Sequence, residues 1–279
     1  MRDFADRIKR LLVGRPVPSG ALGETLLPKR IALPVFASDA LSSVGYAPDE
    51  VLITLAVAGV AATSLSPWVA LAVVGVLAVV VASYRQTVHA YPSGGGDYEV
   101  VSANLGSHAG LLVASALLSD YVLTVAVSVS SGTSYLAAAL PALVPYKVEI
   151  AVAVVTVLAV LNMRGSRESG RAFAIPTYLY MGVIGIMAVV GLVQELTGTL
   201  GRAESAGFDV VTHAGWEQGL TGLAGGFLVL RAFSSGCAAL TGVEAISNGV
   251  PSFQRPKSRN AATTLLLLGG IATLMLMSV

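Results

Sequence analysis

Charged residues are scarce in this chain of 279 residues. Asp, Glu, Lys and Arg make up only 12% of it, whereas a soluble domain carries about 25%. Cysteine is almost absent: Cys237 stands alone, which excludes an intrachain disulfide and a cysteine-cluster metal site. The net charge is only +1, so no overall basic field would attract nucleic acid. The composition therefore argues against a soluble domain, a disulfide-stabilised fold and a nucleic-acid-binding protein.

Apolar residues are abundant instead, at 54% of the chain. They gather in seven segments, most of them close to the roughly 20 residues that a bilayer-spanning helix needs. These segments are residues 31–62, 67–88, 109–140, 148–163, 172–196, 220–250 and 261–279. The pattern predicts an all-α polytopic membrane protein with about seven transmembrane helices.

The positive charges predict how the helices are oriented. With the N-terminus in the cytoplasm, the outer loops carry only two basic residues, Lys147 and Arg202, and Arg231 lies within a span. All other basic residues then lie inside, as the positive-inside rule requires. These are Arg2, Arg7, Lys9, Arg10, Arg15, Lys29, Arg30, Arg85, Arg164, Arg167, Arg171, Arg255, Lys257 and Arg259. We expect a multi-pass protein of the plasma membrane with a cytoplasmic N-terminus.

A short internal similarity predicts an inverted repeat. Residues 40–44 read ALSSV in the first span, and residues 239–243 read ALTGV in the sixth. The second copy starts five spans after the first, so it runs in the opposite direction, as in transporters built from two inverted five-helix repeats. We therefore divide the chain into a cytoplasmic segment (1–30), a first repeat (31–197), an outer loop (198–219) and the first two helices of a second repeat (220–279).

Both copies of this similarity lie where polar residues interrupt an apolar span. The first span holds Asp39, Ser42, Ser43 and Tyr46, and the sixth is interrupted between residues 234 and 242, which include Thr241. Unpaired backbone groups find no partner in lipid, so a broken helix survives only where it lines a protein cavity. We predict that helices 1 and 6 are broken at these points and that an ion or substrate binds where they meet.

The third span adds a polar stripe. Asp120, Thr124 and Ser128 are four residues apart and share one face of a helix. Such a stripe suits coordination of a cation or relay of a proton. For the two hydroxyls, a bond back to their own helix is an equally good interpretation. For Asp120 it is not, because an acid within the membrane is expensive and marks a functional site.

Three acids are expected at a similar depth: Asp39, Asp120 and Glu244, which follows the interruption of the sixth span. Carboxylates close together in a medium of low dielectric cannot all stay ionised. At least one of them would then take up and release protons, which suggests proton coupling. Oxygen atoms of Tyr46, Thr124, Ser128 and Thr241 would suit a hard monovalent ion.

Arg231 is the one basic residue within a span. It lies about two helical turns before the interruption of the sixth span, and Glu50 lies about two turns after that of the first. The inverted repeat would place both in the outer half of the membrane. We predict that Arg231 pairs with Glu50 or Asp49 across an outer vestibule.

A glycine run, YPSGGGDY at residues 91–98, follows the second span. It lacks the Gly-Lys-Ser/Thr that a phosphate-binding loop requires, so flexible packing beside the first helix is the better expectation. No catalytic set of residues stands out. The sequence therefore predicts neither an enzyme nor a bound cofactor.

These motifs together resemble a known family. Residues 91–98 resemble the proline- and glycine-rich signature after helix 2 of amino acid–polyamine–organocation (APC) superfamily permeases. Residues 38–46, 120–128 and 240–245 are similar to the KUP/Kim-type proton-coupled potassium importers within it. The resemblance implies a LeuT-like fold, potassium ligands at Tyr46, Thr124, Ser128 and Thr241, and proton-linked acids at Asp39, Asp120 and Glu244. The transported ions would be H⁺ and K⁺.

Two departures keep alternatives open. Amino acid permeases of this superfamily usually have a glycine-rich break in helix 1, whereas here Ser42, Ser43 and a single Gly45 stand beside an acid, which favours a cation over an amino acid. A LeuT-like core also needs ten helices, so we expect a fragment, and a non-transporting membrane scaffold or sensor is a further alternative. The expected partners are the lipid bilayer and a small cation or amino acid; a homodimer is left open.

Overall fold

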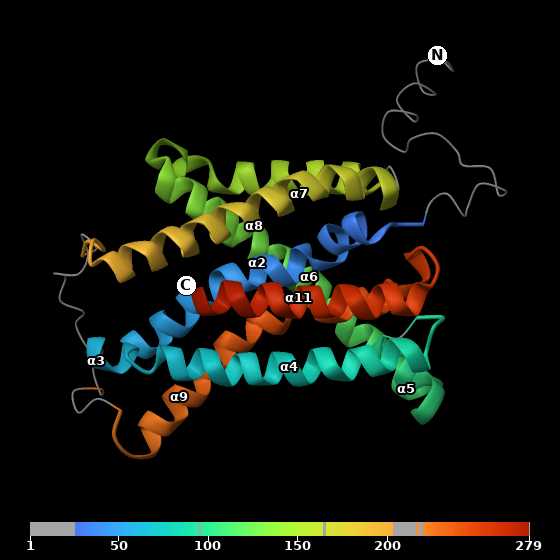
Figure 1. The fold of residues 1–279 in the computed structure, drawn as a ribbon, viewed down its shortest axis with the longest axis horizontal. Coiled ribbons are helices and arrows are strands. Elements are labelled where there is room, and N and C mark those ends of the chain that lie inside the picture. Colours follow the sequence, from blue (N-terminus) through green and yellow to red (C-terminus); the bar gives the residue numbers. More distant parts are fainter. Residues whose placement is uncertain (1–25, 95, 164–165, 203–215, 217–219, 279) are drawn as a thin grey trace, which may run out of the picture. The chain divides into compact units, whose positions relative to one another are not determined.

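The structure is a computed structural model that describes residues 26–94, 96–163, 166–202, 216 and 220–278. Most of the predicted cytoplasmic segment and most of the outer loop therefore lie outside the described residues. The described part is built from helices (Figure 1). In chain order they are α2 (Lys29–Ala56), α3 (Val60–Thr63), α4 (Ser66–Ala90), α5 (Asp97–Leu105), α6 (Ser107–Ala139), η2 (Pro141–Tyr146), α7 (Lys147–Met163), α8 (Ser166–Thr197), α9 (Gly222–Gly236), η4 (Cys237–Leu240), α10 (Val243–Asn248), η5 (Val250–Ser252) and α11 (Lys257–Ser278).

Six helical segments of the described residues are long and apolar enough to cross a membrane. They are Val60–Ala90, Ser107–Ala139, Pro141–Met163, Ala172–Thr197, Gly222–Asn248 and Lys257–Ser278, and they coincide with six of the seven predicted spans. The seventh, α2, is 28 residues long, which exceeds the length that a bilayer requires. It is not among the six because its charged and hydroxyl side chains lower its hydropathy.

The predicted break of the first span is wrong, because α2 is a continuous helix from Lys29 to Ala56. Two of its serines bond back to the helix: the Ser42 hydroxyl donates to the carbonyl oxygen of Asp39 at 2.8 Å, and the Ser38 hydroxyl donates to that of Val35 at 3.5 Å. A serine satisfied in this way has no need to unwind the backbone.

The predicted break of the sixth span is confirmed. α9 ends at Gly236, a 3₁₀ turn covers Cys237–Leu240, and α10 starts at Val243. Gly242, between the last two, has a φ of 80°. Glycine adopts this left-handed conformation without the steric cost that a Cβ brings.

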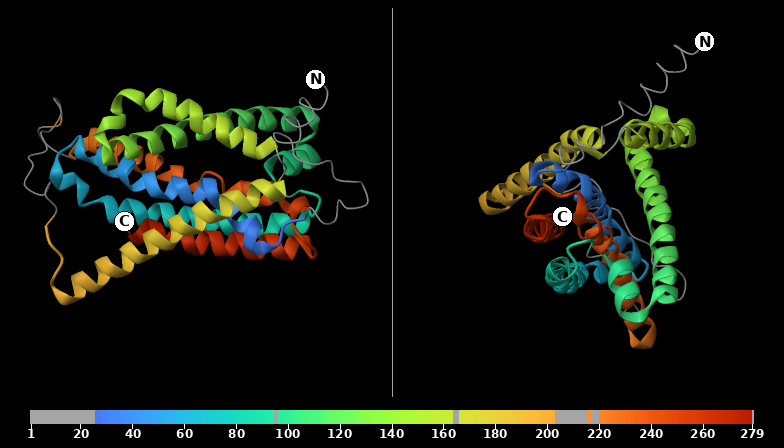
Figure 2. Two further views of the ribbon diagram at one scale, coloured as in Figure 1. Left: turned by 90° about the horizontal axis from the view of Figure 1, so that it is seen from above. Right: turned by 90° about the vertical axis from the view of Figure 1, so that its right-hand side faces the viewer.

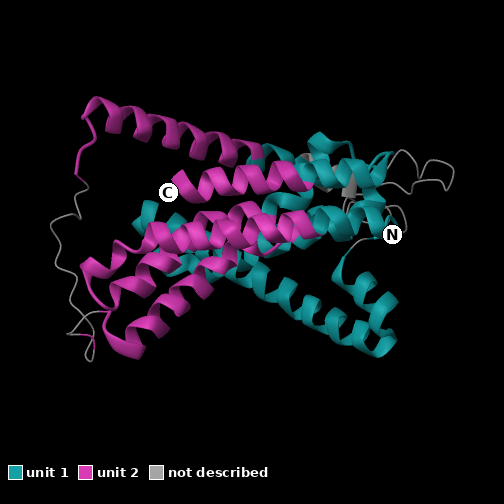
Figure 3. Ribbon diagram, turned by 60° about the horizontal axis from the view of Figure 1, so that its bottom comes forward, with its two compact units in different colours: residues 1–38, 84–177, 244–264 teal, residues 39–83, 178–243, 265–279 magenta. Residues whose placement is uncertain are grey.

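The chain forms two compact units, which Figure 3 colours separately. The first contains residues 1–38, 84–177 and 244–264; the second contains residues 39–83, 178–243 and 265–279. Several helices contribute one part to each unit.

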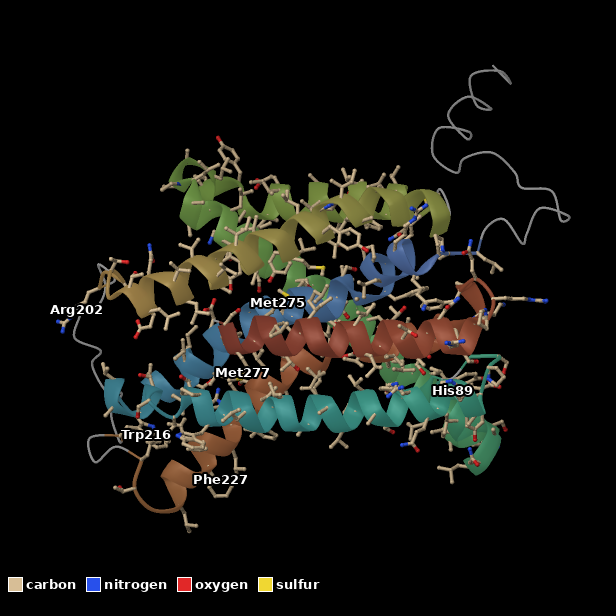
Figure 4. The ribbon with its side chains drawn as sticks, viewed as in Figure 1. His89, Arg202, Trp216, Phe227, Met275 and Met277 are labelled. Atoms are coloured by element: carbon tan, nitrogen blue, oxygen red, sulfur yellow. The ribbon has the colours of Figure 1, made fainter. Side chains whose placement is uncertain are left out.

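Within the second unit, parts of α2, α4 and α9 bury a shared apolar cluster. Val51, Leu55, Val69, Leu228 and Ala232 belong to it. Trp216, labelled in Figure 4, packs against the cluster. Gly236 lets α9 approach α2 and α4 closely, because a Cβ there would lie 3.0 Å from side-chain carbons of both Val51 and Val73. Small residues allow such close approach of helices in membranes.

Within the first unit, the short α5 packs against the beginning of α6 (Figure 2). Gly110 of α6 permits this, because a Cβ there would collide with the side chain of Ser102. The segment before α2 joins the segment after α10 through two backbone hydrogen bonds, from Leu27 N–H to Ser252 and from Gln254 N–H to Leu27. The predicted division of the chain into repeats and an outer loop stays a prediction.

Candidate functional site

Three predicted ligand residues meet in the second unit. The Ser43 hydroxyl on α2 lies 2.9 Å from the Tyr46 hydroxyl one turn later and 2.8 Å from the Thr241 hydroxyl in the break after α9. Ser43 is fully buried. We call Ser43, Tyr46 and Thr241 the hydroxyl cluster. It joins the two segments whose similarity first suggested a repeat.

The direction of each hydrogen bond in the hydroxyl cluster follows from counting protons. Thr241 donates its hydroxyl proton to the carbonyl oxygen of Ala238 at 2.8 Å. Each hydroxyl has one proton and two accepting lone pairs, so Ser43 donates to Thr241, and Tyr46 donates to Ser43. All three protons are used within this chain. One lone pair remains on each of Ser43 and Thr241, and two remain on Tyr46, which gives a cation several oxygen ligands.

A carboxylate lies directly beside the break. A Cβ built on Gly242 would be 2.6 Å from Asp39 Oδ2 and 2.8 Å from the backbone nitrogen of Ala40. Asp39 therefore rests against the glycine that follows Thr241. A carboxylate beside the segment that carries Thr241 favours a cation over an anion there.

The polar stripe on α6 is confirmed as one helix face. Asp120, Thr124 and Ser128 are half-buried, whereas the residues between Asp120 and Thr124 and between Thr124 and Ser128 are exposed. The serines differ along this helix. Ser115 and Ser119 bond back to carbonyls of the preceding turn, but Ser128 Oγ is buried without a hydrogen-bond partner among the described residues. An unpaired buried hydroxyl calls for an explanation, and a ligand role provides one.

Glu244 lies in the first turn of α10 and is 9% exposed. Its carboxyl group lies near enough to the hydroxyls of Tyr84 and Tyr121, in the same unit, for an electrostatic interaction with both. Tyr84 donates to the carboxylate of Asp97 at 2.9 and 3.1 Å, and Asn248 donates to the Tyr121 hydroxyl at 2.9 Å. We call Tyr84, Asp97, Tyr121, Glu244 and Asn248 the Glu244 cluster.

Sequence reasoning missed four of these polar residues, namely Tyr84, Asp97, Tyr121 and Asn248. Tyr121 follows Asp120 directly, and Asp97 ends the glycine run, so two of them were adjacent to residues already singled out. It also missed Tyr180 of α8, whose hydroxyl occupies the space beside Gly45 that a Cβ would take.

Some predicted relationships remain predictions. Asp39 belongs to the second unit, whereas Asp120 and Glu244 belong to the first, so the shared cavity for the three acids stays a prediction. Arg231 on α9 and Glu50 on α2 are both exposed, and Asp49 is half-buried. The ion pair predicted among them likewise stays a prediction.

Comparison with known protein families identifies the family of this chain. Residues 35–279 match the family model described as amino acid permease. The chain belongs to the amino acid permease family. The match covers every described helix of this permease except the first residues of α2, so the hydroxyl cluster and the Glu244 cluster both lie within it.

Two curated relatives carry names that refer to potassium. This permease is 45% identical over 262 residues to the potassium transporter KimA of Bacillus subtilis (strain 168), covering 94% of this chain and 42% of that protein. It is 32% identical over 137 residues to the probable potassium transport system protein Kup 1 of Bradyrhizobium sp. (strain ORS 278), covering 49% of this chain and 20% of that protein. The permease thus spans less than half the length of each.

Proposed function

We propose that this chain is the ion-conducting part of a secondary transporter that takes up potassium together with protons. The observation that supports the proposal most is the hydroxyl cluster, in which Ser43 and Thr241 lie 2.8 Å apart beside the carboxylate of Asp39. In this proposal the LeuT-like inverted repeat places the cluster near the middle of the membrane, with the N-terminus in the cytoplasm.

Potassium fits the chemistry of these oxygens. A hard cation is bound by oxygen ligands, and selectivity for K⁺ elsewhere depends on several uncharged oxygens replacing the hydration shell. Tyr46, Ser43 and Thr241 supply such oxygens, and Asp39 balances a single positive charge. In this proposal Ser42, next to Ser43 on α2, is a further ligand. Thr124 and Ser128 of α6 belong to the other unit and stay predicted ligands. The names of both relatives refer to potassium.

Proton coupling is assigned to Asp39, Asp120 and Glu244. A carboxylate that is buried within a membrane costs free energy in its ionised form. An acid such as Glu244, 9% exposed at the start of a short helix, therefore gains from binding a proton or from a nearby cation. If the inward step requires both a bound cation and a protonated acid, ion uptake is linked to proton uptake.

A proton-coupled amino acid permease is the second candidate, and the description of the matching family model favours it. Such a permease would hold a substrate carboxylate on free backbone amides. The continuous helix α2 argues against such binding of a carboxylate. The backbone amides between Asp39 and Tyr46 lie inside a helix and not at a broken end, where amides are free.

Growth rescue tests the proposal. The complete gene is expressed in cells that lack their own potassium uptake systems, on medium with a low potassium concentration. Growth is expected with the wild-type gene and not with a Ser43→Ala, Thr241→Val double variant. Failure to rescue growth, together with proton-linked uptake of a labelled amino acid, would favour the proton-coupled amino acid permease instead.

A further inference from the structure

Two residues of the glycine run after α4 make side-chain hydrogen bonds to neighbouring helices. Its first residue, Tyr91, accepts a hydrogen bond from Asn104 of α5 at 2.7 Å. Its Asp97 accepts hydrogen bonds from Tyr84 of α4. Asp97 also begins α5, where a negative charge is favoured by the helix dipole. The run is therefore fixed at both ends, to α4 and to α5.

Gly96, the last glycine of the run, lies against α10. A Cβ built on Gly96 would collide with the side-chain amide of Asn248. All three atoms that it would meet belong to that side chain, and the φ of Gly96 is −81°, which any residue adopts. The glycine is thus needed for space and not for backbone conformation.

Asn248 is held from a second direction, because its amide nitrogen donates to the Tyr121 hydroxyl of α6 at 2.9 Å. The residue that follows is also confined: a Cβ on Gly249 would lie 2.6 Å from the ring of Phe36. Phe36 stacks on Phe253 with ring centroids 5.5 Å apart. The end of α10 is therefore fixed by the glycine run, by α6 and by α2.

Fixing this end also fixes Glu244. α10 has only six residues, and Glu244 and Asn248 are four apart, so they share one face of the helix. Tyr84 and Tyr121 lie within electrostatic range of Glu244 in the same unit. These same two tyrosines hold Asp97 and Asn248.

We propose that Gly96, Asp97 and Asn248 form a clamp on α10 and act as positioning residues for Glu244. The clamp explains the glycine run without a nucleotide: Gly96 leaves room for the Asn248 amide, and the Tyr84–Asp97 hydrogen bonds keep Gly96 in place. Its role in transport rests on the proposed function of Glu244, but the contact between Gly96 and α10 does not.

Two measurements on the protein expressed from its complete gene test the clamp. The first is hydrogen–deuterium exchange of the backbone amides of residues 243–249. The second is uptake of rubidium, a tracer for potassium, as KM and maximal rate. The variants are Asn248→Ala, Gly96→Ala and the double variant, with Gly75→Ala as control, because a Cβ on Gly75 of α4 meets nothing within 4 Å.

Both single variants should speed exchange at residues 243–249 by about three- to tenfold, the range expected when one partly buried hydrogen bond is lost. They should lower the maximal rate with little change in the KM for rubidium. The double variant should be no worse than Asn248→Ala alone, because the collision of the new Cβ is with the removed side chain. Gly75→Ala should match the wild type.

Unchanged exchange in Asn248→Ala and Gly96→Ala would overturn the clamp, and so would faster exchange with wild-type uptake. An additive loss in the double variant would also contradict it. If the wild-type protein carries no rubidium, the proposed function fails instead. The exchange measurement then decides alone whether Gly96 and Asn248 hold α10.

Discussion

Ser43 on α2 and Thr241 after α9 share a hydrogen bond of 2.8 Å, although 198 residues separate them in the chain. The bond joins the continuous helix to the broken one. The Thr241 hydroxyl donates a hydrogen bond to the Ala238 carbonyl within the break, so the turn of η4 and the hydroxyl cluster depend on each other. Five predictions follow from this geometry and from the residues around it.

Removal of the Ser43–Thr241 bond should weaken ion binding. Ser43→Ala and Thr241→Val should each raise the KM for rubidium uptake by about three- to tenfold, because each removes an oxygen ligand and one hydrogen bond. The double variant should be clearly less than additive, since the two residues share the bond. Ser64→Ala is the control: its exposed hydroxyl bonds only to the Ala61 carbonyl. Fully additive effects would show that the two hydroxyls act separately.

Gly242→Ala should damage both stability and transport. The φ of 80° costs an L-residue about 1–2 kcal/mol, and the new Cβ would lie 2.6 Å from Asp39 Oδ2. The melting temperature in detergent and the rubidium uptake should both fall. Gly226→Ala on α9 is a matched control, because its Cβ would meet nothing within 4 Å. Equal behaviour of the two variants would refute the contact.

Gly45 and Tyr180 should show size complementation. Gly45→Ala collides with the Tyr180 hydroxyl, while the ring carbon behind that hydroxyl is 3.3 Å from the new Cβ. Tyr180→Phe removes the colliding oxygen, so the double variant should be more stable and more active than Gly45→Ala alone. Melting temperature and uptake measure this. Gly182→Ala, also on α8 but with open space around it, should behave as the wild type.

The sequence predicted the helices well and the local backbone less well. Six spans were recognisable because apolar runs of this length have few alternatives to a membrane helix. The break near Thr241 was also predicted, from the polar residues that interrupt the apolar span, and Gly242 provides the φ that the turn there requires. The break near Asp39 was not correct, because Ser42 bonds to the Asp39 carbonyl within the helix. Polar residues alone do not distinguish a broken helix from a continuous one that satisfies them.

The site was predictable where sequence spacing sets the geometry. Asp120, Thr124 and Ser128 share a face because four residues make about one turn. Contacts between distant segments were not predictable in this way. The glycine run shows this: Gly96 carries no side chain, and its function depends on Asn248, which lies far along the chain and gave no signal of its own.

Arg231 and Glu50 give a prediction that concerns the outer side. Reversal of either charge, as Arg231→Glu or Glu50→Arg, should reduce uptake, and the combined exchange should restore part of it, because an ion pair of opposite orientation can form. Partly exposed pairs contribute about 0.2–1 kcal/mol, so the losses should be a few-fold. Asp49→Asn tests the alternative partner. Absence of rescue in the combined variant would exclude the pair with Glu50.

Potassium-driven proton movement tests the central claim most directly. The protein expressed from its complete gene is reconstituted into proteoliposomes that contain a pH-sensitive dye. An inward potassium gradient is then imposed, while an ionophore for another ion holds the membrane potential constant. The proposal predicts acidification of the lumen with the wild type. Glu244→Gln and Asp120→Asn should abolish the proton signal. Potassium entry without a proton signal in the wild type, or an unchanged signal in both variants, would contradict proton-coupled potassium uptake.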